Sequence, residues 1–186
     1  MIMRNKNVFG CHSSFYYFGL EHLYVSMCQY IKLCIEEGNF IYLIVDDKLY
    51  SNIKGFTEIN KNNSLQISDV CRMINIYNSL SKNEIKEKLL KCENEIVKRG
   101  FKGLSFIIDV AYLISHTSKE DFLKIDFDIT RLISNTRTSV ICTYDFEDYL
   151  DEKRIIDDEI MEKSYESHSY RLYKNRLVNS KGLLGV

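Results

Sequence analysis

Apolar residues in this chain follow two patterns that alternate along its length. In some segments they form continuous runs of four to eight residues, which is typical of strands buried on both faces of a sheet. In others they recur every three or four positions, which is typical of amphipathic helices. The continuous runs predict strands in residues 40–45, 103–110 and 139–144, a strand with its exit loop in residues 8–18, and an edge strand in residues 170–173.

Helices are expected between these strands. The first begins near Leu20 and ends at Gly38, a residue type that often terminates helices. Ser81 and Glu84 form a capping-box sequence that opens another helix, which ends before Gly100. Further helices are predicted in residues 47–56, 118–134 and 155–165, with strand candidates in residues 65–67 and 71–77.

The alternation of strands and helices predicts the fold class. Successive strand, helix and strand units form right-handed crossovers, so their strands pair in parallel. We expect an α/β fold, a three-layer sandwich with a mostly parallel central sheet. It forms one domain of residues 1–178 with a flexible tail of residues 179–186, because no repeat or Gly/Ser-rich linker divides the chain.

The run in residues 103–110 is expected to be the central strand, with Asp109 at its carboxyl end. Ligands of open α/β sheets bind at that edge. A hydrophobic strand that ends in Asp is also what P-loop nucleotide hydrolases use to hold magnesium. Those enzymes need the sequence G-x-x-x-x-G-K-[ST] after the first strand, but residues 11–21 contain one Gly and no Lys. ATP hydrolysis is therefore not expected.

Other catalytic groups have simpler explanations. His12 and Cys142 are candidates for a thiolate pair, and Asp46, Asp109 and Asp145, all at predicted strand ends, are candidates for a metal site. However, His12 is equally suited to bonding loop carbonyls, a Cys142 thiol inside a strand is inert, and Asp residues commonly begin helices. We expect no enzyme, no cofactor and no metal.

A ligand pocket is predicted at the carboxyl edge of the sheet. Aromatic residues with a few acids and one His suit a small, partly apolar molecule. The alternative is that the aromatic residues only fill the core. The expected ligand-binding residues are His12, Phe15, Tyr16, Asp46, Asp109, Tyr112, Cys142, Tyr144 and Asp145, and Tyr77 is a further candidate.

Charge and cysteine content narrow the class of protein. The 25 basic and 26 acidic residues nearly cancel, which does not support binding to nucleic acid. The six cysteines form no C-x-x-C pair and lie mostly in apolar runs, so we expect buried thiols and no disulfide or zinc framework. Without a signal peptide or a membrane-spanning run, the expected location is the cytoplasm.

The order of several short motifs resembles the MEDS domain, the methanogen/methylotroph sensory domain first noted in a regulator of dichloromethane degradation. The resemblance covers residues 8–173 and rests on five segments: CHSSFY (11–16), CIEEGN (34–39), FIYLIVD (40–46), RGFKGL (99–104) and ICTYD (141–145). Two positions depart from the family pattern: Asn39 replaces a Glu, and Ser167-His168-Ser169 stands where the family has His-Pro.

The resemblance implies a degenerate RecA/KaiC-like fold that has lost its phosphate loop and senses a ligand. The matching motif residues are His12, Tyr16, Cys142, Tyr144 and Asp145. We therefore expect a non-catalytic sensory domain that binds a small molecule and relays this to a regulatory protein partner or through self-association, without direct contact to nucleic acid or membrane. The alternatives are a degenerate nucleotide-binding, ATPase-like protein and a ligand-free interaction scaffold.

Overall fold

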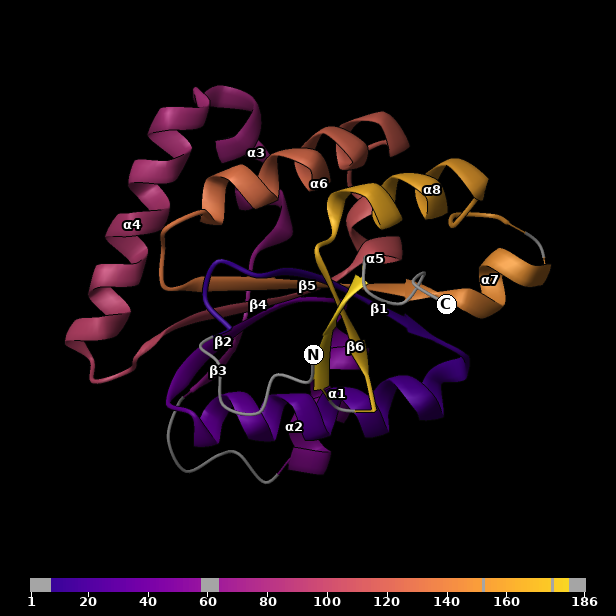
Figure 1. Ribbon diagram of the computed structural model, residues 1–186, viewed down its shortest axis with the longest axis horizontal. Coiled ribbons are helices and arrows are strands. Elements are labelled where there is room, and N and C mark those ends of the chain that lie inside the picture. Colours follow the sequence, from indigo (N-terminus) through magenta and orange to yellow (C-terminus); the bar gives the residue numbers. More distant parts are fainter. Residues whose placement is uncertain (1–7, 58–63, 152, 175, 181–186) are drawn as a thin grey trace.

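The computed structural model describes residues 8–57, 64–151, 153–174 and 176–180. Its centre is one seven-stranded sheet with the strand order β3-β2-β4-β5-β1-β6-β7 (Figure 1). All neighbouring strands pair in parallel except β6 and β7, which are antiparallel. The strands are β1 (His12–Tyr17), β2 (Asn39–Ile44), β3 (Leu65–Ile67), β4 (Gly103–Asp109), β5 (Thr138–Asp145), β6 (Tyr170–Tyr173) and β7 (Arg176–Asn179).

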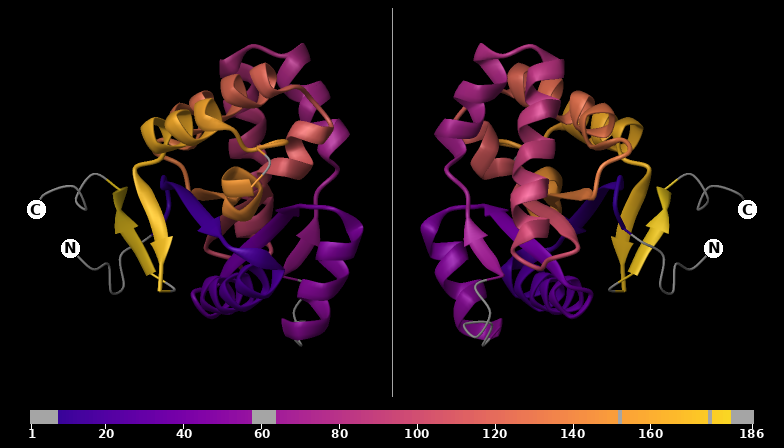
Figure 2. Two further views of the ribbon diagram at one scale, coloured as in Figure 1. Left: turned by 90° about the vertical axis from the view of Figure 1, so that its right-hand side faces the viewer. Right: turned by 90° about the vertical axis from the view of Figure 1, so that its left-hand side faces the viewer.

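Helices cover both faces of the sheet and complete a three-layer α/β sandwich, as predicted (Figures 1 and 2). One face carries α1 (Gly19–Glu36) and α2 (Asp47–Thr57). The opposite face carries α3 (Val70–Ser79), α4 (Lys82–Lys98), α5 (Val110–Ser115), α6 (Lys119–Ile133) and α8 (Asp158–Ser167). The short helix α7 (Phe146–Asp151) follows the carboxyl end of β5.

Side-chain alternation along the strands divides the core between the two faces. Ile107 and Ile141 pack toward α1, while Ile108 and Cys142 pack toward α5, α6 and α8. Because both faces of the central strands are covered, these strands need continuous apolar runs. The predicted central strand in residues 103–110 is confirmed as β4, between β2 and β5.

Gly103 is required at the start of β4. A Cβ atom at this position would overlap the carbonyl oxygen of Arg137 and the ring of Phe9. Any side chain would therefore push β4 away from the segment that leads into β5, so the Gly in the RGFKGL segment has a steric reason.

The predicted strand in residues 71–77 is wrong, because this segment belongs to helix α3. Asp69 caps the helix by accepting a hydrogen bond from the Arg72 amide at 3.0 Å. The polar residues Arg72 and Asn75, which interrupt a strand pattern, lie three positions apart on the exposed side of a helix.

The carboxyl-terminal third differs in detail from the sequence prediction. The last long helix begins at Asp158, three residues later than expected, because Asp157 is its N-cap and the Asp148 carboxylate holds the amides of Ile155 and Ile156. The structure also contains α5, α7 and β7, which the sequence analysis did not predict. Within the predicted tail, Asn179 ends β7, and residues 181–186 lie outside the described part of the chain.

Candidate functional site

The connection from β1 to α1 leaves no room for a phosphate loop. Strand β1 ends at Tyr17 and α1 begins at Gly19, so Phe18 is the only residue between them. Gly19 makes this tight turn possible with a φ of 72°, in the left-handed region. A phosphate cradle needs a longer run of backbone amides that curl around the anion. The predicted absence of a phosphate loop is thus confirmed.

An aromatic pocket of about 320 Å³ lies at the carboxyl end of β1. The buried Nε of Arg171 finds no hydrogen-bond partner among the described residues. Of the predicted ligand-binding residues, Tyr16 lines this pocket. Its full lining is Tyr16, Tyr17, Phe18, His22, Phe146, Met161, Tyr165 and Arg171.

The three Asp residues at the strand ends are helix caps. A carboxylate oxygen of Asp46 accepts from the Leu49 amide at 2.7 Å, and one of Asp109 accepts from the Tyr112 amide at 3.2 Å. Asp145 accepts from the amide of Glu147 at 3.0 Å. These carboxylates therefore serve the helices that follow each strand, which was the simpler of the two explanations in the sequence analysis.

Asp109 is the most buried of the three, with 9% of its surface exposed. Burial raises the pKa of this carboxyl group to about 6, and the negative charges of Asp46 and Asp145 add to the rise. The hydrogen bonds from the amides of Tyr112 and Ala111 oppose it. The carboxyl edge of the sheet is thus an acidic surface on which one carboxylate is costly to ionise.

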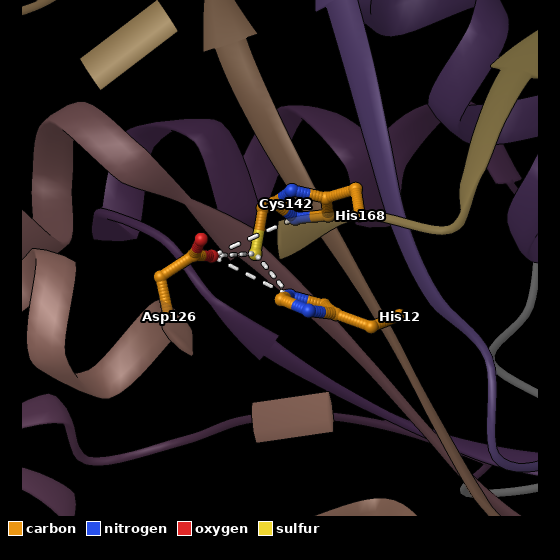
Figure 3. A group of neighbouring side chains, drawn as sticks. All are labelled: His12, Asp126, Cys142 and His168. Carbon is orange, nitrogen blue, oxygen red and sulfur yellow. Dashed lines mark hydrogen bonds and ion pairs between the residues drawn. The ribbon is translucent and has the colours of Figure 1, made fainter. Parts of the chain in front are cut away.

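A second group of polar side chains lies inside the molecule, beneath α6 and α8. His12 begins β1, Cys142 lies within β5, Asp126 lies on α6, and His168 directly follows α8. All four are buried, with 0–2% of their surface exposed. Figure 3 shows the four side chains pointing toward one another. We call these four residues the buried quartet.

One ligand atom from each residue of the buried quartet lies within 4.8 Å of the other three. The Oδ1 atom of Asp126 is 3.4 Å from His12 Nε2 and 3.6 Å from His168 Nε2. The Cys142 Sγ atom is 3.6 Å from both His12 Nε2 and Asp126 Oδ1. Two imidazoles, a thiol and a carboxylate are the donor types that zinc binds in proteins.

The remaining polar atoms of the buried quartet are held by neighbouring groups. His12 Nδ1 is 3.0 Å from Thr130 Oγ1, and His168 Nδ1 is 2.6 Å from the carbonyl oxygen of Ser164. The second carboxylate oxygen of Asp126 accepts from the hydroxyl of Ser167 at 2.5 Å. These outer hydrogen bonds therefore fix the orientation of both imidazoles and of the carboxylate, on the side of each group that faces away from the other three residues.

Burial controls the ionisation of the buried quartet. It lowers the pKa of His168 to about 4, with a further contribution from the charge of His12. Burial and the nearby Asp126 carboxylate raise the pKa of the Cys142 thiol well above its usual value. A protonated thiol with no exposed surface cannot attack a substrate, so the arrangement does not support nucleophilic catalysis.

An apolar groove of about 690 Å³ lies on the same face of the sheet, bounded by α3, α4 and α6. Its floor is formed by strand residues that include Ile44, Phe106, Ile108 and Val140. Its helical walls include Met73 and Ile76 from α3, Ile85, Leu89 and Cys92 from α4, and Ile125 and Ile129 from α6.

The sequence matches one family model over residues 11–169, which is most of the chain. The family is described as MEDS: methanogen/methylotroph, DcmR sensory domain. The chain belongs to this family. The resemblance found in the sequence motifs is thereby confirmed, and this MEDS domain has a sensory role by family. No curated protein matches the sequence.

Two solved structures are similar to this MEDS domain. One is the KaiC-like protein PH0186 from the hyperthermophilic archaeon Pyrococcus horikoshii OT3, which is 12% identical in sequence. The match covers 92% of this chain and 80% of the PH0186 chain, with a TM-score of 0.48. The flagellar accessory protein FlaH from Methanocaldococcus jannaschii is 13% identical, with coverages of 91% and 75% and a TM-score of 0.46. Because both TM-scores are below 0.5, neither likeness bears on the function of this chain.

No described helix of the MEDS domain combines the length and the apolar character that a membrane-spanning segment requires.

The structure does not bring the predicted ligand-binding residues into one cavity. His12 lies at the beginning of β1 and Cys142 lies three residues before the end of β5, so the expected position of both at the carboxyl edge is wrong. Phe15 packs on the face that carries α1. Tyr144 is fully buried on the other face, where its ring contacts those of Tyr16 and His168.

Tyr112 differs again, because its ring packs against His116, the C-cap residue of α5, with ring centroids 4.4 Å apart. None of the nine predicted residues lines the apolar groove, although Tyr77, the further candidate, does.

Two members of the buried quartet were not predicted as site residues. Asp126 occupies an inward position of α6 between the buried residues Phe122 and Ile129. A carboxylate within an otherwise apolar helix face is a signal that could have identified it. His168 stands in the segment that departs from the family's His-Pro, and only the fold shows that its side chain reaches Asp126.

Proposed function

We propose that this MEDS domain is a non-catalytic sensor that binds a small, largely apolar molecule in the groove bounded by α3, α4 and α6. Binding is relayed to a regulatory protein partner or to a second copy of the chain. The observation that carries this proposal is the groove itself, whose volume of about 690 Å³ falls among those of small-molecule sites.

The lining of the groove indicates the chemistry of the ligand. Aliphatic and aromatic side chains form the floor of the groove and most of its walls. Burial of the apolar surface of a ligand against these side chains would be favourable. A few polar side chains with hydroxyl groups, among them Ser68, Tyr77 and Thr138, also line the groove. This combination suits a compact molecule with one or two polar atoms, bound mainly by shape.

Helix α3 is the element best placed to change its position or stability when a ligand binds in the groove. Val70 is its one fully buried residue, so α3 has little contact with the core apart from the groove. A ligand beneath Met73 and Ile76 would add contacts to this helix and shift its position or its stability. The outward side of α3, with Arg72 and Asn75, would then present a changed surface to a partner.

The lack of catalysis in this proposal rests on the groups available. The Asp residues at the carboxyl edge hold helix N-termini, the thiol of Cys142 is buried and protonated, and the β1–α1 turn cannot cradle phosphates. A degenerate nucleotide-binding protein would need another means to hold phosphate. Magnesium-dependent ATP turnover that is lost in Asp109→Asn would overturn this part of the proposal.

A thermal-shift screen tests the proposal. The panel consists of short-chain alcohols, halomethanes and small aromatic alcohols. A ligand at 100 times its Kd stabilises the folded state by about 2.7 kcal/mol, which raises the Tm of a domain of this size by about 5–10 °C. We expect at least one compound of this class to produce such a shift.

Two substitutions locate the site. Ile76→Trp fills the groove and should abolish the shift, whereas Val25→Trp, on the exposed side of α1 beyond the other face of the sheet, should leave it intact. Met161→Trp fills the aromatic pocket at the end of β1. A shift that survives Ile76→Trp and disappears in Met161→Trp would place the ligand at the carboxyl edge and contradict the groove.

A further inference from the structure

The buried quartet has the form of a metal site. We propose that His12, Asp126, Cys142 and His168 together bind one Zn²⁺ ion. Tetrahedral coordination with bonds of about 2.0–2.1 Å to nitrogen or oxygen and about 2.3 Å to sulfur separates the ligand atoms by about 3.3–3.6 Å. Four of the six pairs of ligand atoms in the buried quartet are 3.4 to 3.6 Å apart, and all six lie within 4.8 Å.

The hydrogen bonds around the quartet assign the tautomer of both histidines. A carbonyl oxygen can only accept, so His168 Nδ1 carries the proton that it donates to Ser164. The Thr130 hydroxyl donates to the carbonyl oxygen of Ser167 at 3.2 Å, so it accepts from His12 Nδ1. In the neutral form of each ring the lone pair therefore lies on Nε2, the atom that faces the other ligands.

Among the described residues, the Cys142 thiol is the one donor in contact with these atoms, and its single proton can serve either His12 Nε2 or Asp126 Oδ1, each 3.6 Å from Sγ. His168 Nε2 is buried without a hydrogen-bond partner among the described residues, and its nearest charged neighbour is the Asp126 carboxylate, itself an acceptor. Asp126 Oδ1 lies 3.4 Å from His12 Nε2 and 3.6 Å from His168 Nε2, and both separations are longer than an ordinary hydrogen bond. Two lone pairs and a carboxylate directed at one point call for a cation between them.

The charges also balance with zinc present. Cys142 would release its proton and bind as a thiolate, so that the thiolate and the Asp126 carboxylate neutralise the ion and both imidazoles remain neutral. The buried site then carries no net charge, whereas a lone carboxylate with 2% exposure is costly. Nitrogen and sulfur donors favour zinc over magnesium or calcium, which prefer oxygen ligands.

The ligand set is closed, which defines the role of the ion. Four protein ligands leave no position for water or substrate, as in structural zinc sites. The ion would join α6 and the end of α8, on one face of the sheet, to strands β1 and β5. It would thus fix the helical layer beside the groove, because Ile125 and Ile129 of α6 line the groove on either side of Asp126 in sequence.

Metal analysis of the full chain tests this proposal. The protein is purified from zinc-supplemented medium, and about one zinc per chain is expected. After exchange with Co²⁺, the protein should show the intense visible bands of tetrahedral Co²⁺ and a thiolate-to-metal charge-transfer band. Cys142→Ser should lose the charge-transfer band. The matched control Cys34→Ser, which replaces a buried thiol of α1 on the other face of the sheet, should keep it.

A second variant keeps the proposal testable if Cys142→Ser fails to fold. Thr130→Val leaves all four ligands in place and removes the hydrogen bond to His12 Nδ1. Such outer contacts typically change metal affinity by about 10–100-fold, so Thr130→Val should weaken zinc to that extent in competition with a chelator. A folded wild-type chain that retains no zinc after incubation and desalting, or a Co²⁺ form without a thiolate band, would overturn the proposal.

Discussion

Replacement of Asp109 by Asn should make the protein more stable at neutral pH. Asp109 is 9% exposed, and its pKa in the folded state is about 6, compared with an ordinary value of 3.8. The difference is about 2 units, and each unit corresponds to 1.36 kcal/mol, so ionisation of this group costs the folded state about 3 kcal/mol. Asn removes that cost and can still accept the hydrogen bond from the Tyr112 amide.

The sign of the effect follows from proton binding. Between about pH 4 and 6 the folded state binds the proton of Asp109 more tightly than the unfolded state, so stability falls as the pH rises through this window. Below about pH 4 both states are protonated and the cost vanishes. Asp109→Asn also removes a negative charge from the N-terminus of α5, which lowers the gain in the free energy of unfolding by about 0.3–1 kcal/mol. We therefore expect Asp109→Asn to gain about 2–3 kcal/mol at pH 7 and little at pH 4.

Urea denaturation at pH 4, 5, 6 and 7 measures the free energy of unfolding of both proteins, and the difference between them isolates Asp109. Asp69→Asn is the control, because Asp69 makes the same N-cap contact on α3 in an exposed position. The reasoning is refuted if Asp109→Asn is no more stable than the wild type at pH 7, or if its advantage is the same at pH 4 as at pH 7.

Two further substitutions test the packing around the site. Gly103→Ala should destabilise the protein by about 1–3 kcal/mol or more in urea denaturation, because its Cβ would overlap the Arg137 carbonyl and the Phe9 ring; unchanged stability would contradict the steric argument. Tyr16→Phe should cost about 1 kcal/mol in the same assay through loss of the 2.7 Å hydrogen bond to Ser164 Oγ, whereas Tyr173→Phe, on an exposed ring, should cost almost nothing.

The sequence predicted the sheet well because the central strands are buried on both faces. Continuous apolar runs such as residues 103–110 have few alternatives to a buried strand. Segment 71–77 was assigned wrongly because the strand candidate began at Cys71 and left out Val70, which completes a helical stripe with Met73, Ile74 and Tyr77. Helices α5 and α7 have six residues each, which is too short for a periodic pattern to appear.

Only two of the four residues of the buried quartet could be identified as site candidates from the sequence. His12 and Cys142 stood out by residue type, and the structure places their side chains 3.6 Å apart. Asp126 and His168 lie on α6 and after α8, and their contact depends on how both helices cross β1 and β5. No spacing in the sequence encodes that crossing. The groove likewise arises from the packing of three helices against the sheet, to which individually unremarkable apolar residues contribute.

Methyl NMR of the methionines tests the sensory account most directly. Met73 lines the groove, Met161 lines the aromatic pocket at the end of β1, and Met27 is buried beneath the other face of the sheet. The protein is labelled with ¹³C at the methionine methyl groups and titrated with the compound that gives the largest thermal shift. The account predicts a saturable change in the Met73 signal with little change at Met161 and Met27. A change confined to Met161, or no change at Met73 at saturation, would contradict it.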